Sequence, residues 1–70
     1  MPKLYSSKQV IKALERKGFV YVSQKGSHVK FHGDSFTVIV PAGRKEIPFG
    51  TLKSILRQAN LREEDLKNKK

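Results

Sequence analysis

The sequence predicts an α+β fold in which a helix, three antiparallel strands and a second helix follow one another. Both helices are expected on one face of the three-stranded sheet. Three observations indicate this order: a capped amphipathic segment near the N-terminus, three short strand-like segments separated by tight turns, and a second amphipathic segment after a proline. The chain has 70 residues, and a chain of this size buries one hydrophobic core at most. We therefore expect a single domain over residues 1–70, with an ordered core from about residue 4 to residue 66.

The first helix is expected over residues 7–17. The segment Ser6-Ser7-Lys8-Gln9 fits a capping box, in which the Ser6 hydroxyl and the Gln9 side chain satisfy backbone N–H groups reciprocally. Apolar side chains then recur at helical spacing, at Val10, Ile11 and Leu14. Gly18 suits the left-handed position that ends a helix.

Three strands are expected over residues 19–22, 28–32 and 36–40. The first is aromatic and β-branched, the second alternates strictly between polar and apolar side chains, and the third is rich in β-branched residues. Turn-forming residues separate them, at positions 26–27 and 33–35. Because both connections are short, the strands are predicted to form an antiparallel meander.

The second helix is expected to begin between Pro48 and Thr51. Its apolar stripe, at i, i+3, i+4 and i+7, is Leu52, Ile55, Leu56 and Ala59. Asn60 can take the left-handed cap position. Residues 62–67 are expected to add a short turn, and the basic tail 67–70 is expected to be flexible.

Charge narrows the classes of partner. The chain carries 15 Lys and Arg against 6 Asp and Glu, a formal net charge of +9. This balance favours a polyanionic partner, whether nucleic acid, an anionic membrane surface or an acidic protein. The longest strongly apolar run covers only residues 38–40, whereas a bilayer-spanning helix needs about 20 residues. The N-terminus also lacks the apolar core of a signal peptide, so we expect a cytoplasmic protein without membrane contact.

The second strand carries the main functional signal. If Val29 and Phe31 face the helices, His28, Lys30 and His32 project from the opposite, open face. An unperturbed histidine has a pKa of about 6.5, so His28 can accept and return a proton near neutrality. RNA carries its own nucleophile, the 2′-hydroxyl, and a base that removes its proton allows attack on the adjacent phosphorus.

The neighbours of His28 add to this chemistry. Lys25 and Lys30 can stabilise negative charge on phosphate oxygens, Gly26 allows close backbone approach, and Ser27 supplies a hydroxyl donor. A simpler interpretation is that His28 is a half-exposed strand residue without chemistry, and from this residue alone the simpler interpretation is favoured. A shared metal ion is not expected, because residues i and i+4 of a strand lie about 13 Å apart, and the chain has no Cys for a zinc site. No cofactor is expected.

Other cations lie outside the strands. Arg44 and Lys45 are expected to be exposed in the loop before the second helix, and Lys53 and Arg57 share an exposed helix face. For the helix pair, a solvated face is as good an interpretation as an RNA contact. The segment 50–51 lies near a helix N-terminus that can bind phosphate, although a plain helix start is the better interpretation there.

Several motifs, in order, resemble the HicA toxins of HicAB toxin–antitoxin systems, also called the YcfA-like family. They are Gly26-Ser27-His28 followed by Lys30-Phe31, then residues 38–41, 46–52 and 55–59. The resemblance implies a double-stranded-RNA-binding-domain-like fold and an mRNA-cleaving toxin of a type II system. It also implies that His28 is the catalytic histidine and that a HicB-like antitoxin binds and masks this region. Val29 and Gly33 depart from the pattern of many relatives, and no role is transferred to His32.

Three hypotheses follow. The leading one is a metal-independent endoribonuclease that uses His28 as general base or acid. The alternative is a non-catalytic RNA-binding module with the same fold and charge. A third is a basic subunit whose main partner is an acidic protein. The side chains expected to contact RNA are Lys25, Lys30, Arg44, Lys45, Lys53 and Arg57, with Gly26 and Ser27 from the motif.

Overall fold

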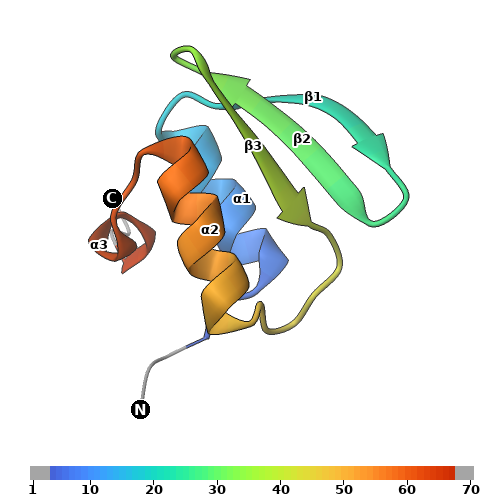
Figure 1. Ribbon diagram of the computed structural model, residues 1–70, viewed down its shortest axis with the longest axis vertical. Coiled ribbons are helices and arrows are strands. Elements are labelled where there is room, and N and C mark those ends of the chain that lie inside the picture. The colour runs from blue at the N-terminus through green and yellow to red at the C-terminus, as the bar shows by residue number, and fades with distance from the viewer. Residues whose placement is uncertain (1–3, 68–70) are drawn as a thin grey trace.

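The computed structural model describes residues 4–67, with side chains up to residue 66 (Figure 1). Its elements in chain order are α1 (Ser7–Arg16), β1 (Val20–Lys25), β2 (His28–Gly33), β3 (Phe36–Pro41), α2 (Phe49–Ala59) and α3 (Glu63–Lys67). The predicted α+β order is therefore confirmed, with the expected C-terminal turn formed as the short helix α3. Residues 68–70 of the predicted tail lie outside the described residues.

The three strands form one antiparallel sheet in the order β1-β2-β3. The β1–β2 turn is Gly26-Ser27, and only Gly26 has a positive φ (60°), as a type II′ hairpin requires. The β2–β3 turn is Asp34-Ser35, and both residues have positive φ (50° and 76°), as in a type I′ hairpin. Both tight turns were predicted, although Gly33 belongs to β2 rather than to the turn.

Strand β1 is longer than predicted. Residues 23–25 are polar, so their composition does not indicate a strand, yet Ser23 pairs with Lys30 and Lys25 with His28. The hairpin register extends the strand, because backbone pairing to an already ordered neighbour does not require apolar side chains. The register shifts between Tyr21 and Ser23, which marks a bulge.

The core lies between one face of the sheet and the helices. The side chains of Val29, Phe31, Val38 and Val40 are buried from the sheet, and α1 and α2 add the predicted stripes. Ile11, a member of the predicted apolar stripe of α1, is only partly buried against the core. Figure 1 shows α1 and α2 on the same side of the sheet. Every residue of β1 is exposed, so the helices leave this edge strand uncovered.

No helix within residues 4–67 is both long enough and apolar enough to span a membrane. The short α3 is held by the partly buried Leu66, which packs against the core, and by polar contacts with α1. Asp65 forms an ion pair with Lys17 (Nζ to Oδ1, 3.1 Å), and its backbone carbonyl accepts a hydrogen bond from Arg16 (3.0 Å).

Candidate functional site

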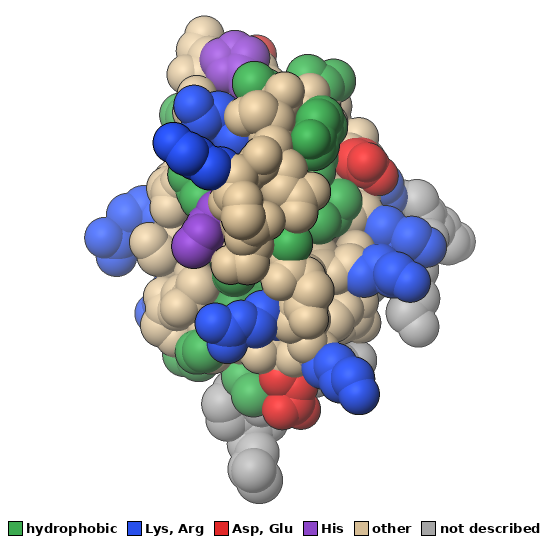
Figure 2. Space-filling view, turned by 90° about the vertical axis from the view of Figure 1, so that its right-hand side faces the viewer, with side chains coloured by type: hydrophobic (Ala, Val, Ile, Leu, Met, Phe, Trp, Pro, Cys, Tyr) green, Lys and Arg blue, Asp and Glu red, His purple; other side chains and the backbone are tan. Residues whose placement is uncertain are grey.

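His28 opens strand β2 on the open face of the sheet. The burial of β2 alternates, with Val29 and Phe31 buried and His28, Lys30 and His32 exposed, as predicted. Figure 2 shows both histidines of the chain on one face, with basic side chains close to them. In the sheet register His28 lies opposite Lys25 on one side and opposite Pro41 on the other.

A hollow of about 310 Å³ lies at this end of the sheet. Its lining residues come from four segments: β2, β3, the β3–α2 loop and α2. They are His28, Ile39, Pro41, Arg44, Pro48, Thr51 and Gln58. Two of the residues predicted from sequence, His28 and Arg44, therefore meet at one cavity although 16 residues separate them in the numbering (44 − 28).

Gln58 connects α2 to the free edge of the sheet. The backbone N–H of Ile39 donates to Oε1 of Gln58 at 3.2 Å. Because the partner is an N–H group, the amide oxygen must face the strand, and the Nε2 hydrogens are left to donate elsewhere. Thr51 lines the same hollow seven residues earlier, about two helical turns away. Thr51 and Gln58 thus line the hollow from the helix side, and His28 lines it from the sheet.

A buried serine holds the loop that carries Arg44. Ser7 is only 3% exposed, and its hydroxyl donates to the Pro41 carbonyl (2.5 Å) and accepts from the Arg44 N–H (3.0 Å). The Ser7 N–H also donates to the Arg44 carbonyl at 2.9 Å. Two residues that line the hollow, Pro41 and Arg44, are therefore attached to the first turn of α1.

The Gly26-Ser27 turn is tied to the same region. The Gln24 side-chain amide donates to the Gly26 carbonyl (3.0 Å), and the Ala42 N–H donates to the Ser27 carbonyl (2.6 Å). The turn is thus fastened to the end of β3, next to the hollow. Lys25 precedes it, and as the cross-strand partner of His28 it projects from the same face.

The remaining predicted cations lie elsewhere. Lys30 is opposite Ile39 on the open face, whereas Lys45 lines a different hollow beside α1. Lys53 and Arg57 line a third hollow, on the other flank of α2, and the Lys53 ammonium lies 5.6 Å from the centre of the Phe49 ring. The helical repeat explains this separation, because residues 53 and 57 project on the opposite side of the buried stripe from residues 51 and 58.

His32 has a local partner. Its Nδ1 lies 3.3 Å from the Thr37 hydroxyl, across the β2–β3 pair. Within residues 4–67, no group of three or more His, Cys, Asp or Glu side chains is placed to hold a metal ion.

A family model described as the HicA toxin of bacterial toxin–antitoxin systems matches residues 7–61. The chain belongs to the HicA toxin family. No curated protein matches it. The resemblance predicted from the motifs is thereby confirmed, and the match runs from α1 through α2, so it includes every residue of the His28 hollow. Membership makes this chain the toxin side of a toxin–antitoxin pair, which implies an antitoxin partner.

Sequence reasoning missed two residues that build this candidate site. Gln58 was seen only as part of a motif, although a helical wheel places it on the Thr51 flank and could have indicated it. Ser7 was seen only inside the capping box. Its contacts are 34 and 37 residues away in sequence, so no local pattern could have shown them.

Proposed function

We propose that this HicA-family chain is a metal-independent endoribonuclease that cleaves mRNA, with His28 as the acid–base group. The observation that carries the proposal is the meeting of the His28 imidazole, Arg44 and the Gln58 amide at one hollow. Cleavage of an RNA phosphodiester needs proton transfer and stabilisation of the charge that develops on the phosphate. An exposed acid–base group supplies the first, and a guanidinium with a neutral hydrogen-bond donor supplies the second.

The reaction uses the nucleophile that RNA carries. His28 accepts the proton of the 2′-hydroxyl, and the 2′-oxygen attacks the adjacent phosphorus. The bond from phosphorus to the 5′-oxygen of the next nucleotide breaks, and that oxygen takes a proton from solvent. The products are a 2′,3′-cyclic phosphate and a 5′-hydroxyl end. His28 then returns its proton to solvent, for which its exposure on the open face is suited.

The charge that develops on the phosphate oxygens is stabilised by cations and donors on both sides. Arg44 and Gln58 line the hollow, and Lys25 is the cross-strand neighbour of His28. Gly26 and Ser27 form the adjacent turn, which lets the RNA backbone pass close to the protein. Lys30 extends this basic face, while Lys45, Lys53 and Arg57 contribute to the overall attraction of RNA.

The partner in this proposal is an acidic, HicB-like antitoxin that covers the His28 face. Occupying the hollow would exclude RNA from the imidazole and neutralise part of the +9 charge. Co-expression with a HicB-like protein encoded by a neighbouring gene is expected to relieve toxicity and to yield a complex. Toxicity that persists beside such a neighbour, with no complex formed, would contradict the assignment of the partner.

The reaction is tested with a short RNA incubated in EDTA, beside the same RNA carrying 2′-deoxy sugars throughout. The proposal predicts cleavage of the first, no cleavage of the second, and cyclic phosphate ends in the products. Loss of cleavage in EDTA would exclude the metal-free route. RNA that stays intact but is bound, with affinity falling steeply as salt rises, would favour the non-catalytic RNA-binding module instead.

A further inference from the structure

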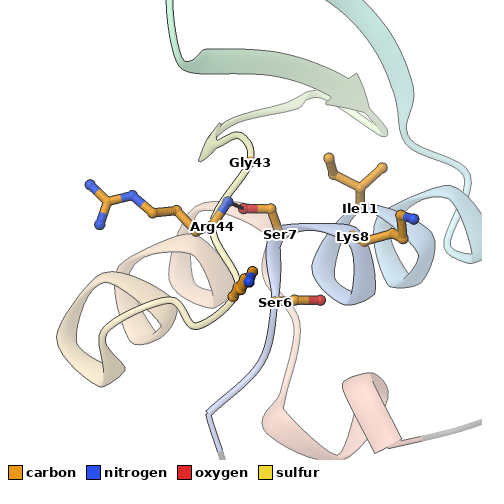
Figure 3. A pocket seen from close by; sticks show the side chains of 7 residues that line it. Ser6, Ser7, Lys8, Ile11, Gly43 and Arg44 are labelled. Carbon is orange, nitrogen blue, oxygen red and sulfur yellow. Dashed lines mark hydrogen bonds between the residues drawn. The ribbon is translucent and has the colours of Figure 1, made fainter.

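A second hollow, of about 440 Å³, lies on the other side of the β3–α2 loop, between that loop and the first turns of α1 (Figure 3). It is lined by Ser6, Ser7, Lys8, Ile11, Gly43, Arg44 and Lys45. The volume falls in the range of about 300–1,000 Å³ that is usual for small-ligand sites. Arg44 lines this hollow and the His28 hollow as well, so the two are neighbours across one loop.

The loop presents different groups to its two sides. In Figure 3 the Arg44 side chain points away from Lys8 and Ile11, while its backbone N–H is held by the Ser7 hydroxyl. The second hollow is therefore formed by the loop backbone on one side and by the exposed side of α1 on the other. Gly43 adds no side chain, has a φ of +72°, and faces open space where a Cβ would be.

The rim of this hollow is cationic and its lining is partly apolar. Within residues 4–67, neither Lys8 nor Lys45 has an ion-pair partner, and both are exposed. Ile11 is only partly buried against the core, so part of its side chain remains available to a ligand. A ligand with a flat apolar part and an attached anion fits such a surface.

Most of the amide groups at the start of α1 are occupied by bonds within the protein. The N–H groups of Ser6, Ser7 and Gln9 donate to Gln9, Arg44 and Ser6, respectively. These three N–H groups are therefore not available to an anion, and the positive charge at the hollow comes from the Lys8 and Lys45 side chains.

We propose that this α1–loop hollow binds a nucleotide of the RNA that flanks the cleaved phosphodiester. Lys8 and Lys45 contact its phosphates, and its base lies against Ile11 and the open backbone of Gly43. The inference rests on the proposed ribonuclease function, because it is continuity with the His28 hollow through Arg44 that selects RNA among anionic ligands. It also selects single-stranded RNA, since a base must be free of a duplex to enter a cavity.

The test measures RNA binding rather than cleavage. His28→Ala protein keeps the RNA intact, and the dissociation constant for a single-stranded RNA is measured over a range of salt concentrations. In this background Lys8→Gln and Lys45→Gln are combined, and Lys12→Gln is the control. Lys12 is an exposed lysine one turn from Lys8 on the same helix, but it does not line the hollow.

Each lost contact between a cation and a phosphate of a single strand lowers the slope of log affinity against log salt by about 0.7. The magnitude of this slope is therefore expected to be about 1.4 smaller in the double variant. Lys12→Gln is expected to leave the slope unchanged. Equal slopes in the two variants would overturn the subsite, as would a complete lack of RNA binding. An unchanged RNA affinity with weakened antitoxin binding would assign the hollow to the antitoxin and overturn it too.

These results are separable from those of the proposed function. Cleavage by the unmodified protein together with equal slopes would leave the ribonuclease standing without this subsite. A reduced slope without any cleavage would leave an RNA-binding subsite on a chain that does not cut.

Discussion

The two flanks of helix α2 differ in what they present beside similar hollows. One flank carries Lys53 and Arg57 around a hollow of about 330 Å³, which Glu63 also lines. The other carries Thr51 and Gln58, with no charge of its own, and faces His28 and Arg44. The flank with more charge has no group that transfers a proton near neutral pH. Under the proposed function the chemistry lies on the less charged flank, because proton transfer requires the His28 imidazole and a basic patch alone does not supply it.

Arg44→Ala is expected to give a large loss on the His28 side. If the guanidinium stabilises the phosphate in the transition state, the single-turnover cleavage rate falls by about 10²-fold, as for other donors at developing charge. Lys45→Ala, the neighbouring loop cation outside the His28 hollow, serves as the control. Equal losses of rate for Arg44→Ala and Lys45→Ala at saturating protein would contradict a role for Arg44 in the transition state.

Gln58→Glu tests the neutral donor. The carboxylate still accepts from the Ile39 N–H but can no longer donate toward the hollow. The cleavage rate is expected to fall by about tenfold, less than the 10²–10³ seen for enclosed donors, because Gln58 is exposed. The melting temperature should not fall.

Arg57→Gln is the matched control for Gln58→Glu, because it changes the net charge by the same amount at the adjacent residue on the other flank. Equal losses of rate in the two variants would mean that only net charge matters at this helix.

Ser7→Ala is expected to affect stability and, through the loop, cleavage. It leaves the Pro41 carbonyl and the Arg44 N–H without their partner, at a cost of about 1–3 kcal/mol in the free energy of unfolding. Thermal unfolding measures this loss, since each kcal/mol shifts the melting temperature of so small a domain by about 4–8 °C. Cleavage by the folded variant should fall a few-fold.

Ser6→Ala separates capping from loop attachment. Ser6 is the N-cap of α1 and accepts from the Gln9 N–H, and its loss costs about 1 kcal/mol. It should not alter cleavage by the folded protein. A similar fall in cleavage for both serine variants would show that helix fraying, rather than the Ser7 attachment, disturbs the site.

The smallest effect is expected at Asp65, in the helix that follows the Lys53 and Arg57 flank. The Arg62 backbone N–H and the Lys17 ammonium hold the pKa of Asp65 below its ordinary value of 3.8. Because the folded pKa is lowered, the stabilisation is present above pH 3.8 and is lost as pH falls through the folded pKa. The melting temperature of Asp65→Asn should therefore be lower than that of the unmodified protein at neutral pH. The two melting temperatures should converge in acid. Equal stability of the two at neutral pH would contradict this contribution.

The parts of the fold with local signals were predictable. The capping box at Ser6, the strict alternation over 28–32 and the stripe from Leu52 to Ala59 each specify an element through its own neighbours. The end of β1 was not predictable, because residues 23–25 pair through backbone groups whatever their side chains.

The residues of the candidate site were likewise predictable only where a local signal marks them. His28 was indicated by its motif and its exposed strand position. Its association with Arg44 was not predictable from either segment, because the path of the β3–α2 loop depends on Ser7. Gln58 binds Ile39 across 19 residues, a contact that exists only once α2 lies along the edge of β3.

The proposed function places the chemistry on the His28 flank of α2. The most direct test compares single-turnover cleavage of one RNA, at saturating protein, by His28→Ala and by a Lys53→Ala, Arg57→Ala double variant. Loss of an acid–base group is expected to lower the rate by about 10²–10⁴-fold, while the double variant cleaves at the rate of the unmodified protein once the RNA is bound. Undiminished cleavage by His28→Ala, or an equal loss in the double variant, would contradict the account.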